Sequence, residues 1–188
     1  LDARGEPAAR HDVLRTGADV TVDLRVDRAV RGHPRAGMIR RAEVGEGLKY
    51  MEHADRVTQK IELVPGPAFI GDSFHIGIVL GNLLSNAVKY QDLKKPDAWV
   101  KVSVKTSPQD CHITVEDNGL GIAAAHQGRI FELFYRASNQ SFGSGLGLYI
   151  TRNAVEKMKG TIEMFSEEGV GTKFVVCLPN LNIAVDKG

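Results

Sequence analysis

Several features that mark particular protein classes are scarce or missing in this chain of 188 residues. It has two cysteines, Cys111 and Cys177, which fall in strand-like segments and share no metal-ligand spacing, so we expect buried free thiols in a reducing compartment. No apolar run approaches the ~18 residues of a membrane-spanning helix, and no signal peptide is visible. The net charge of +1 provides no general attraction to nucleic acid or to an anionic membrane. We therefore expect a soluble piece without a nucleic-acid partner and without direct membrane contact.

The remaining composition is typical of one globular domain with an appendage. Hydrophobic residues make up 43% of the chain and charged residues 25%, which is enough for a single sizeable core. Up to residue 41 the cationic side chains are all Arg, whereas Lys dominates afterwards, and glycine and proline interrupt any helical pattern in the upstream part. We expect an irregular or linker segment over residues 1–40, a domain over 41–182 and a tail over 183–188. Because the first residue is Leu1, we also expect the chain to be a fragment.

Shorter patterns predict elements on either side of the boundary near residue 40. Val20 to Val26 alternates enough for a short strand, and Thr58 to Val64 predicts another. A helix is predicted over Ile39 to Ala54, although its two glycines each weaken it by ~1 kcal/mol relative to alanine. The segment from His11 to Thr16 is expected to be an exposed polar turn.

The stretch around which the rest is organised runs from Phe74 to Tyr90 and predicts a helix with two faces. A polar Gly-Asp-Ser triplet just before it supplies N-cap candidates. Asn82, Asn86 and Tyr90 repeat every four residues with Lys89 beside them, so they line one edge. The opposite, apolar stripe is suited to packing on a sheet and comprises Ile76, Val79, Leu80, Leu83, Leu84, Ala87 and Val88.

The polar edge has the donor groups of a magnesium nucleotide site. The carboxamide oxygens of Asn82 and Asn86 are hard ligands of the kind that Mg²⁺ accepts beside substrate phosphates. Lys89 supplies a point charge for phosphate, and the ring of Tyr90 can cover a base. A solvated helix face carries the same residue types, so this pattern alone leaves both interpretations open.

A hairpin with one wet face follows, because Val100, Val102 and Val104 alternate with polar residues, as do Cys111, Ile113 and Val115 after a turn. It ends in Asp117-Asn118-Gly119-Leu120-Gly121-Ile122. Asp117 can accept a hydrogen bond from an exocyclic amine such as that of adenine, while the glycines let the backbone approach the ring. A simple turn uses the same residue types, so both interpretations stay open.

A second hairpin is predicted from Thr161 to Phe165 and from Thr172 to Leu178. Thr172 can bond water or a base near Asp117, or it can be an ordinary strand threonine.

Two arginines lie between the hairpins, at the ends of a predicted short helical patch from Arg129 to Arg136. Its apolar residues Ile130, Phe131 and Phe134 are expected in the core. A guanidinium group near a phosphate site can stabilise charge on transferred oxygens, and we favour Arg136 over Arg129 for this.

A glycine run from Gly143 to Gly147 opens a helix that is predicted to continue through Lys159. Free N–H groups at such a helix start form a natural cradle for phosphate. The spacing is not that of a dinucleotide fingerprint, and no Lys-Ser/Thr follows as in a P-loop. The side chains expected to pack this helix are Leu146, Ile150, Ala154 and Met158.

In chain order, five of these motifs resemble the N, G1, F, G2 and closing boxes of the catalytic ATP-binding domain of sensor histidine kinases, within the GHKL group of folds. The motifs are N-L-L-S-N-A-V-K-Y, D-N-G-L-G-I, F-E-L-F-Y-R, G-S-G-L-G-L and G-T-K-F, between about Leu48 and Leu181. The resemblance implies an α/β two-layer sandwich, with helices covering one face of a mixed β-sheet. It also implies that ATP and Mg²⁺ lie between the opening helix and a lid over Ala123 to Ser144.

The resemblance further implies a role for each motif residue. Asn86 would coordinate Mg²⁺, and Asn82, Lys89 and Arg136 would serve the phosphates and their transfer. Tyr90 would flank the adenine. The adenine pocket would be formed by Asp117, Gly119, Gly121, Ile122 and Thr172, and the phosphates would be wrapped by Gly143, Gly145, Leu146 and Gly147.

Asn82 stands where the chaperone, gyrase and mismatch-repair ATPases of the same group carry a Glu that activates water. Asn cannot take a proton, and a positioned general base contributes ~10² to 10⁴ in rate, so we expect slow hydrolysis. The function implied is transfer of the γ-phosphoryl group to a histidine on a dimerisation helix absent from this fragment. Relay to an aspartate of a response regulator receiver domain would follow, in the cytoplasm, even where the parent protein is membrane-anchored.

Two other functions fit the same fold. One is an anti-sigma-type Ser/Thr kinase, and the other is a nucleotide-binding switch without phosphoryl transfer. The segment around His11 is similar to a phosphoacceptor box, but its spacing is off by one residue and Gly17 replaces the proline, so we do not expect His11 to be the acceptor.

Overall fold

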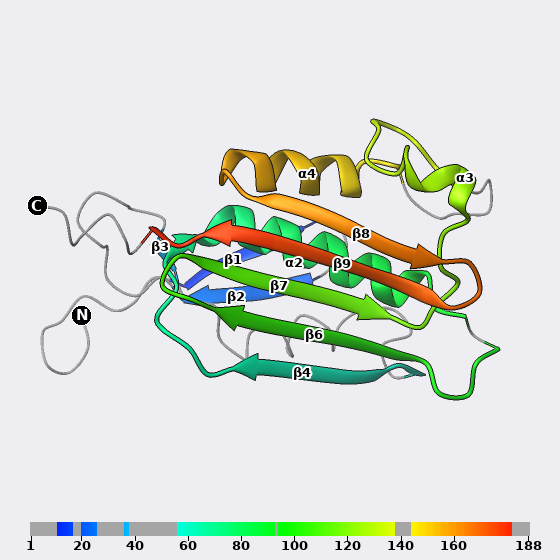
Figure 1. Cartoon of the computed structure of the whole chain (residues 1–188), viewed down its shortest axis with the longest axis horizontal. Coiled ribbons are helices and arrows are strands. Elements are labelled where there is room, and N and C mark those ends of the chain that lie inside the picture. The colour runs from blue at the N-terminus through cyan, green and yellow to red at the C-terminus, as the bar shows by residue number, and fades with distance from the viewer. Residues whose placement is uncertain are drawn as a thin grey trace, which may run out of the picture.

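The computed structural model describes residues 56–92, 94–137 and 144–181, together with the backbone of three short upstream strands. The upstream strands are β1 (His11–Thr16), β2 (Val20–Arg25) and β3 (Ala36–Gly37). The main body is a five-stranded mixed sheet with helices on one face (Figure 1). The predicted α/β two-layer sandwich is confirmed.

The sheet has the strand order β4-β6-β7-β9-β8. Its edge strand β4 (Thr58–Val64) runs parallel to β6 (Trp99–Thr106), and all other neighbours are antiparallel. The remaining strands are β7 (Asp110–Asp117), β8 (Thr161–Glu167) and β9 (Gly171–Pro179). Both predicted hairpins are therefore present. Their buried side chains alternate with half-buried and exposed ones, so one face of the sheet packs on the helices and the other stays open.

Helix α2 (Ser73–Lys89) packs its apolar stripe on the sheet, and every residue predicted for that stripe is buried. It begins after β5 (Gly71–Asp72), where the Asp72 side chain accepts hydrogen bonds from the N–H groups of Phe74 and His75. This cap satisfies backbone donors that have no partner inside the helix. The predicted helix and its cap are confirmed.

Helix α4 (Gly147–Lys157) lies beside α2, but it faces the core differently from the prediction. Its buried residues are Thr151, Ala154 and Val155, whereas Ile150 is 41% exposed. Thr151 can occupy the inner face because its hydroxyl donates to the Gly147 carbonyl at 2.8 Å, which satisfies its polar atom. Ala154 is buried and Met158 packs against the core, as predicted, but the expectation for Ile150 was wrong because Thr151 takes its place on the inner face. The helix ends two residues before Lys159.

The helical patch predicted over Arg129 to Arg136 is not a helix. A single turn, α3 (Ala124–Gln127), precedes it, and successive i→i+3 hydrogen bonds then carry the chain through tight turns. Ile130 is buried and the ring of Phe131 lies edge-on to that of Phe174, as expected for core residues. Phe134 is 65% exposed with a positive φ of 61°, so its assignment to the core was wrong.

The upstream strands change one prediction and confirm another. A strand was predicted over Val20 to Val26, and β2 occupies that position. The expected turn from His11 to Thr16 is instead strand β1, which pairs antiparallel with β2 beside α2 (Figure 1). The helix predicted over Ile39 to Ala54 lies outside the described residues.

Both cysteines are free, as predicted, but only Cys111 is buried, and Cys177 is half-buried on the open face. In the described part of the chain, no helix combines the length and the apolar character that crossing a bilayer requires.

Candidate functional site

The polar edge of α2 forms one wall of the candidate site. Asn82, Asn86 and Tyr90 are half-buried, and Lys89 is exposed beside them with its Nζ atom 5.2 Å from the centre of the Tyr90 ring. Tyr90 ends the helix, and its backbone N–H donates to the Asn86 carbonyl at 3.0 Å. Two carboxamides, an ammonium and a phenol are thus presented along about two turns of one helix.

Lys89 and Arg136 come from different elements, and their positive charges repel each other. The pKa of Lys89 lies below its usual range, first because the side chain is partly buried and second because the Arg136 guanidinium is near. Two cations held in mutual repulsion favour an anion between them. The turn that carries Arg136 therefore adds its charge to the charge at the end of α2.

Asp117 lies at the end of β7, on the same face of the sheet as the core residues of that strand. Burial raises the pKa of its carboxyl group to about 6, and backbone hydrogen bonds from Gly119 and Thr172 oppose this rise. The Gly119 N–H donates to Asp117 Oδ1 at 2.9 Å. The carboxyl group is fixed in place and retains acceptor capacity for a further donor.

The turn after Asp117 is joined to the end of α2. The Leu120 N–H donates to the Tyr90 carbonyl at 2.9 Å. A Cβ atom at Gly119 would overlap the same carbonyl oxygen, so only glycine permits this approach. Asp117 and Tyr90, 27 residues apart in the sequence, are consequently held next to each other by backbone contacts.

Ile122 and Thr172 meet through a side chain that the sequence analysis did not select. The Ile122 N–H donates to Ser166 Oγ at 2.8 Å, and Ser166 Oγ lies 2.9 Å from the buried Thr172 hydroxyl. Gln127 donates to the carbonyls of Ile122 and Ser166. Gly121, with φ +66°, forms the turn between Leu120 and this network.

The start of α4 lies against the polar edge of α2. Gly147 faces Asn82, since a Cβ atom there would lie 3.5 Å from Asn82 Oδ1. Leu146 is the N-cap residue of α4, and its apolar side chain makes no capping hydrogen bond to the N-terminal N–H groups. Gly145 has φ +72° and packs on the backbone of Phe134 and Tyr135, which fixes where the chain enters α4. Gly143 lies outside the described residues.

Within the described ranges, the contacts of Arg129, the second arginine considered, are local. Its Nε atom donates to Glu132 at 3.0 Å, and its guanidinium lies 4.4 Å from the centre of the Tyr135 ring. The Tyr135 hydroxyl is in turn 2.7 Å from His126 Nδ1. These contacts give Arg129 a role within the turn rather than at the polar edge of α2.

Lys95 is the residue that the sequence analysis missed and that matters most to the shape of the site. Its ammonium lies 2.6 and 3.3 Å from the carbonyls of Asn118 and Gly119, and 2.8 and 3.2 Å from those of Gly169 and Val170. It therefore joins the turn after β7 to the turn between β8 and β9. In the sequence Lys95 belongs to an ordinary polar loop, and nothing there distinguishes it from its neighbour Lys94.

Comparison with known proteins identifies the family of this chain. Residues 71–182 match the model of the histidine kinase-, DNA gyrase B- and HSP90-like ATPases. The sensor protein RprX of Bacteroides fragilis (strain YCH46) is 36% identical over 140 residues, which cover 71% of this chain and 26% of that protein. The sensor-like histidine kinase SenX3 of Mycobacterium tuberculosis (strain ATCC 25618 / H37Rv) is 36% identical over 116 residues, 60% of this chain and 28% of SenX3.

Solved structures show the same fold. The mycobacterial sensor histidine kinase MprB is 28% identical, with a TM-score of 0.56 over 68% of this chain and 86% of that chain. Full-length ShkA aligns with a TM-score of 0.65 over 77% of this chain and 31% of that one, at 24% identity. The chain spans between 26% and 28% of the length of the two curated relatives above. It belongs to the family of histidine kinase-, DNA gyrase B- and HSP90-like ATPases, and the relatives named here are sensor proteins and sensor histidine kinases.

Proposed function

We propose that this chain is the catalytic ATP-binding domain of a sensor histidine kinase. In this proposal it transfers the γ-phosphoryl group of ATP to a histidine on a dimerisation helix of the parent protein, in the cytoplasm. An aspartate of a response regulator receiver domain then receives the phosphoryl group. The observation that supports this best is the convergence of three separate segments, the Asp117 turn, the start of α4 and the turn with Arg136, on the polar edge of α2.

In this proposal the adenine lies between Tyr90 and the turn after β7. Asp117 accepts the exocyclic amine, and the Ile122–Ser166–Thr172 network supports the adjoining wall. A site built to hydrogen-bond an amino group discriminates strongly against a base without one, because its buried acceptor would be left unpaired. Guanine carries a carbonyl oxygen where adenine carries its 6-amino group, so the pocket is selective for adenine over guanine. A structure of ShkA, which shares the fold, is a complex with AMPPNP, and this supports nucleotide binding at such a site.

The phosphates lie over the polar edge of α2 and the start of α4. The N–H groups at the α4 N-terminus receive no capping hydrogen bond from the N-cap residue Leu146 and can donate to phosphate oxygens, as can Lys89 and Arg136. The donors fit Mg²⁺, because Asn86 offers a half-buried hard oxygen within one turn of the phosphate-binding Lys89. When bound, Mg²⁺ supplies neutralisation of phosphate charge.

Transfer in this site depends on positioning and charge. The bond from the γ-phosphorus to the β–γ bridging oxygen breaks while a bond to the acceptor histidine nitrogen forms, and ADP leaves with the bridging oxygen. Lys89 and Arg136 stabilise the negative charge that moves onto the phosphate oxygens. Asn82 orients the phosphates but cannot deprotonate water, so hydrolysis competes poorly with transfer.

Two measurements test the proposal, the first of which is calorimetric titration of the chain with a non-hydrolysable ATP analogue, with and without Mg²⁺. We expect magnesium-dependent binding that Asn86→Ala reduces and Asp117→Asn abolishes. Asn153→Ala on α4 is the matched control for Asn86→Ala, since the Asn153 side chain donates to the Tyr149 carbonyl of its own helix. A folded wild-type chain that does not bind the analogue would refute the proposal.

The second measurement separates histidine kinase activity from the alternatives. The chain is mixed with labelled ATP and a separately expressed dimerisation domain of the parent protein. Acid-labile label on the histidine of that domain is expected for a histidine kinase, whereas acid-stable phosphoserine or phosphothreonine on a partner would indicate the anti-sigma-type kinase. Tight ATP binding without transfer to either acceptor would favour the nucleotide-binding switch.

A further inference from the structure

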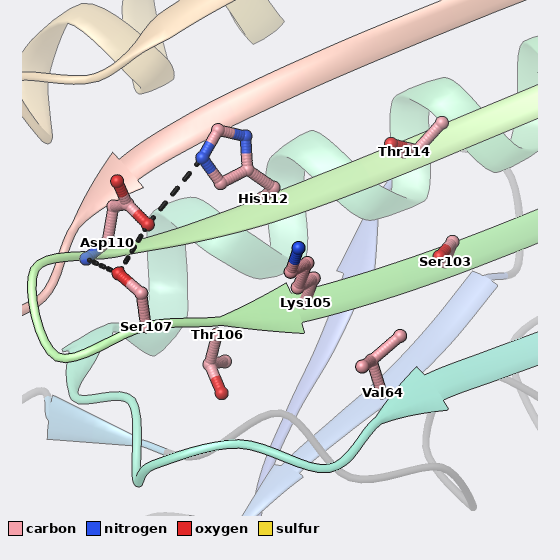
Figure 2. Close-up of a pocket in the computed structure, with 8 residues that line it drawn as sticks. All are labelled: Val64, Ser103, Lys105, Thr106, Ser107, Asp110, His112 and Thr114. Carbon is pink, nitrogen blue, oxygen red and sulfur yellow. Dashed lines mark hydrogen bonds and ion pairs between the residues drawn. The ribbon is translucent and has the colours of Figure 1, made fainter.

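A cluster of metal-ligating side chains lies on the open face of the sheet, at the opposite end of β7 from Asp117. Asp110 and His112 are two residues apart on β7, and Cys177 of β9 is directly opposite His112 in the ladder. Side chains two apart on a strand share a face, so all three project away from the helices. Figure 2 shows Asp110 and His112 on this face, at the end of a shallow groove.

The spacing of the three ligand atoms is close to that of a tetrahedral metal site. His112 Nε2 lies 3.5 Å from Asp110 Oδ1 and 3.7 Å from Cys177 Sγ, and all three atoms lie within 4.8 Å of one another. Zinc–ligand distances of about 2.0–2.3 Å at tetrahedral angles put neighbouring ligand atoms roughly 3.3–3.6 Å apart. A shift of a few tenths of an ångström therefore brings two of the three pairs to coordinating geometry.

The surroundings keep these side chains in place. β7 and β9 are inner strands of the sheet, and their opposite faces carry fully buried residues such as Ile113 and Val176. The Ser107 hydroxyl donates to Asp110 Oδ1 at 2.7 Å, and the Ser107 oxygen accepts the Asp110 N–H at 3.0 Å (Figure 2). Such outer hydrogen bonds orient a carboxylate ligand and strengthen its binding of a metal.

We propose that Asp110, His112 and Cys177 form a binding site for a borderline divalent transition-metal ion, Zn²⁺ in particular, with water as the fourth ligand. A thiolate, an imidazole and a carboxylate together suit Zn²⁺, whereas Mg²⁺ and Ca²⁺ prefer oxygen ligands alone. On binding, the Cys177 sulfur forms a bond to the metal and its proton passes to solvent. The thiolate and the Asp110 carboxylate then balance the charge of the dication. This site is separate from the proposed nucleotide site and does not depend on it.

One neighbouring side chain opposes a cation in this place and so provides a sharp test. Lys105 of β6 is directly opposite His112 and lines the same groove (Figure 2). Its ammonium repels a bound dication, which lowers the affinity of the site. Removing that charge with Lys105→Met should tighten zinc binding several-fold.

The experiment uses the whole chain, free of nucleotide and stripped of metal under reducing conditions, and titrates it with Zn²⁺ by calorimetry. We expect one ion per chain, at least about tenfold weaker binding in His112→Ala and in Cys177→Ser, and roughly tenfold weaker binding in Ser107→Ala. Thr114→Ala is the control, because Thr114 lies on the same strand and face without belonging to the cluster. Titration with Co²⁺ should give a thiolate-to-metal absorption band in the wild type that Cys177→Ser lacks.

Unchanged zinc affinity in both His112→Ala and Cys177→Ser, or a wild-type Co²⁺ spectrum without the thiolate band, would overturn the proposal. Circular dichroism of each variant without metal establishes that it is folded. Should one variant fail to fold, Asp110→Asn provides the same test, because Asn keeps the size of the side chain and is a much weaker zinc ligand. Zn²⁺ should also raise the unfolding temperature of the wild type, and raise that of the ligand variants by less.

Discussion

Among single residues, Asp117 combines a strong structural cost with the proposed recognition of adenine. Burial favours the neutral form of its carboxyl group, which is why its pKa rises from 3.8 to about 6. The folded chain therefore binds a proton more tightly than the unfolded chain. It follows that the free energy of unfolding decreases as the pH rises between about 4 and about 6, and that the ionised carboxylate remains destabilising above pH 6.

Asp117→Asn should therefore stabilise the nucleotide-free chain at neutral pH while it abolishes nucleotide binding. We expect the free energy of unfolding at pH 7.5 to rise by about 1–2 kcal/mol, after allowing for the partial exposure of the side chain. The difference from wild type should shrink towards pH 4. Urea unfolding between pH 4 and 8 measures this, and Glu163→Gln, on the exposed side of β8, is the control. Identical pH dependence in wild type and Asp117→Asn would contradict the assigned cause.

The charges of Lys89 and Arg136 lead to a second prediction at this scale. Lys89→Met and Arg136→Met should each weaken binding of an ATP analogue about tenfold, since each removes a charged hydrogen bond to phosphate. Binding of adenosine, which has no phosphate, should stay within twofold of wild type. Calorimetry with both ligands gives the comparison, with Lys157→Met, on the exposed last turn of α4, as the control. Equal losses for adenosine and the ATP analogue would mean that the variants disturb the whole site.

At the scale of elements, the sequence indicated the helices and strands well because their apolar periods are long and regular. The stripe of α2 and both hairpins follow from that period alone, and all the residues named for the stripe are buried. The orientation of α4 did not follow, because a threonine whose hydroxyl bonds its own helix counts as polar in a sequence and as core in the fold. The turns around Phe134 were missed for a related reason, since i→i+3 bonding in a short apolar segment looks helical.

In the candidate site, too, some residues could be predicted from the sequence and others could not. Residues in motifs, such as Asn86 and Asp117, stand out in the sequence by spacing. Ser166 and Lys95 contact backbone groups far along the chain. A contact between a side chain and a distant backbone group produces no periodic pattern in the sequence, so neither residue could be predicted.

The contacts of Lys95 make it a positioning residue whose loss should loosen two turns together. Lys95→Met should increase hydrogen exchange at the N–H groups of Leu120 and Gly169, because the carbonyl groups around them lose their shared partner. We also expect weaker nucleotide binding, with Lys95→Arg restoring part of it. Lys94→Met is the matched control, since Lys94 contacts Asp92 through its backbone N–H, which the substitution keeps. Unchanged exchange at both turns would show that Lys95 does not join them.

On the scale of the whole molecule, α2 holds the structure together. It packs on the sheet and lies beside α4, and its core side chains Leu80 and Leu83 have no exposed surface. The nucleotide edge and the core stripe are thus opposite sides of the same helix. A change in the packing of the core stripe therefore also moves the side chains of the proposed nucleotide site.

Leu83→Ala should consequently destabilise the entire described domain by about 2–5 kcal/mol, through lost burial and the cavity left behind. Ile150→Ala, on the exposed side of α4, should cost less than about 1 kcal/mol. The single tryptophan, Trp99 on β6, reports on the sheet by fluorescence, and circular dichroism reports on the helices. The two signals should give one coincident urea transition in each protein. A separate early transition of the helices in Leu83→Ala would contradict this view of α2.

The alternation of β7 has a consequence for how this protein can change over time. Asp117 belongs to the odd-numbered, helix-facing row of the strand, whereas Asp110 and His112 belong to the even-numbered, open-face row. Deleting one residue within β7 would exchange the two rows and turn Asp117 away from α2. Insertions and deletions within this strand should therefore survive only in pairs.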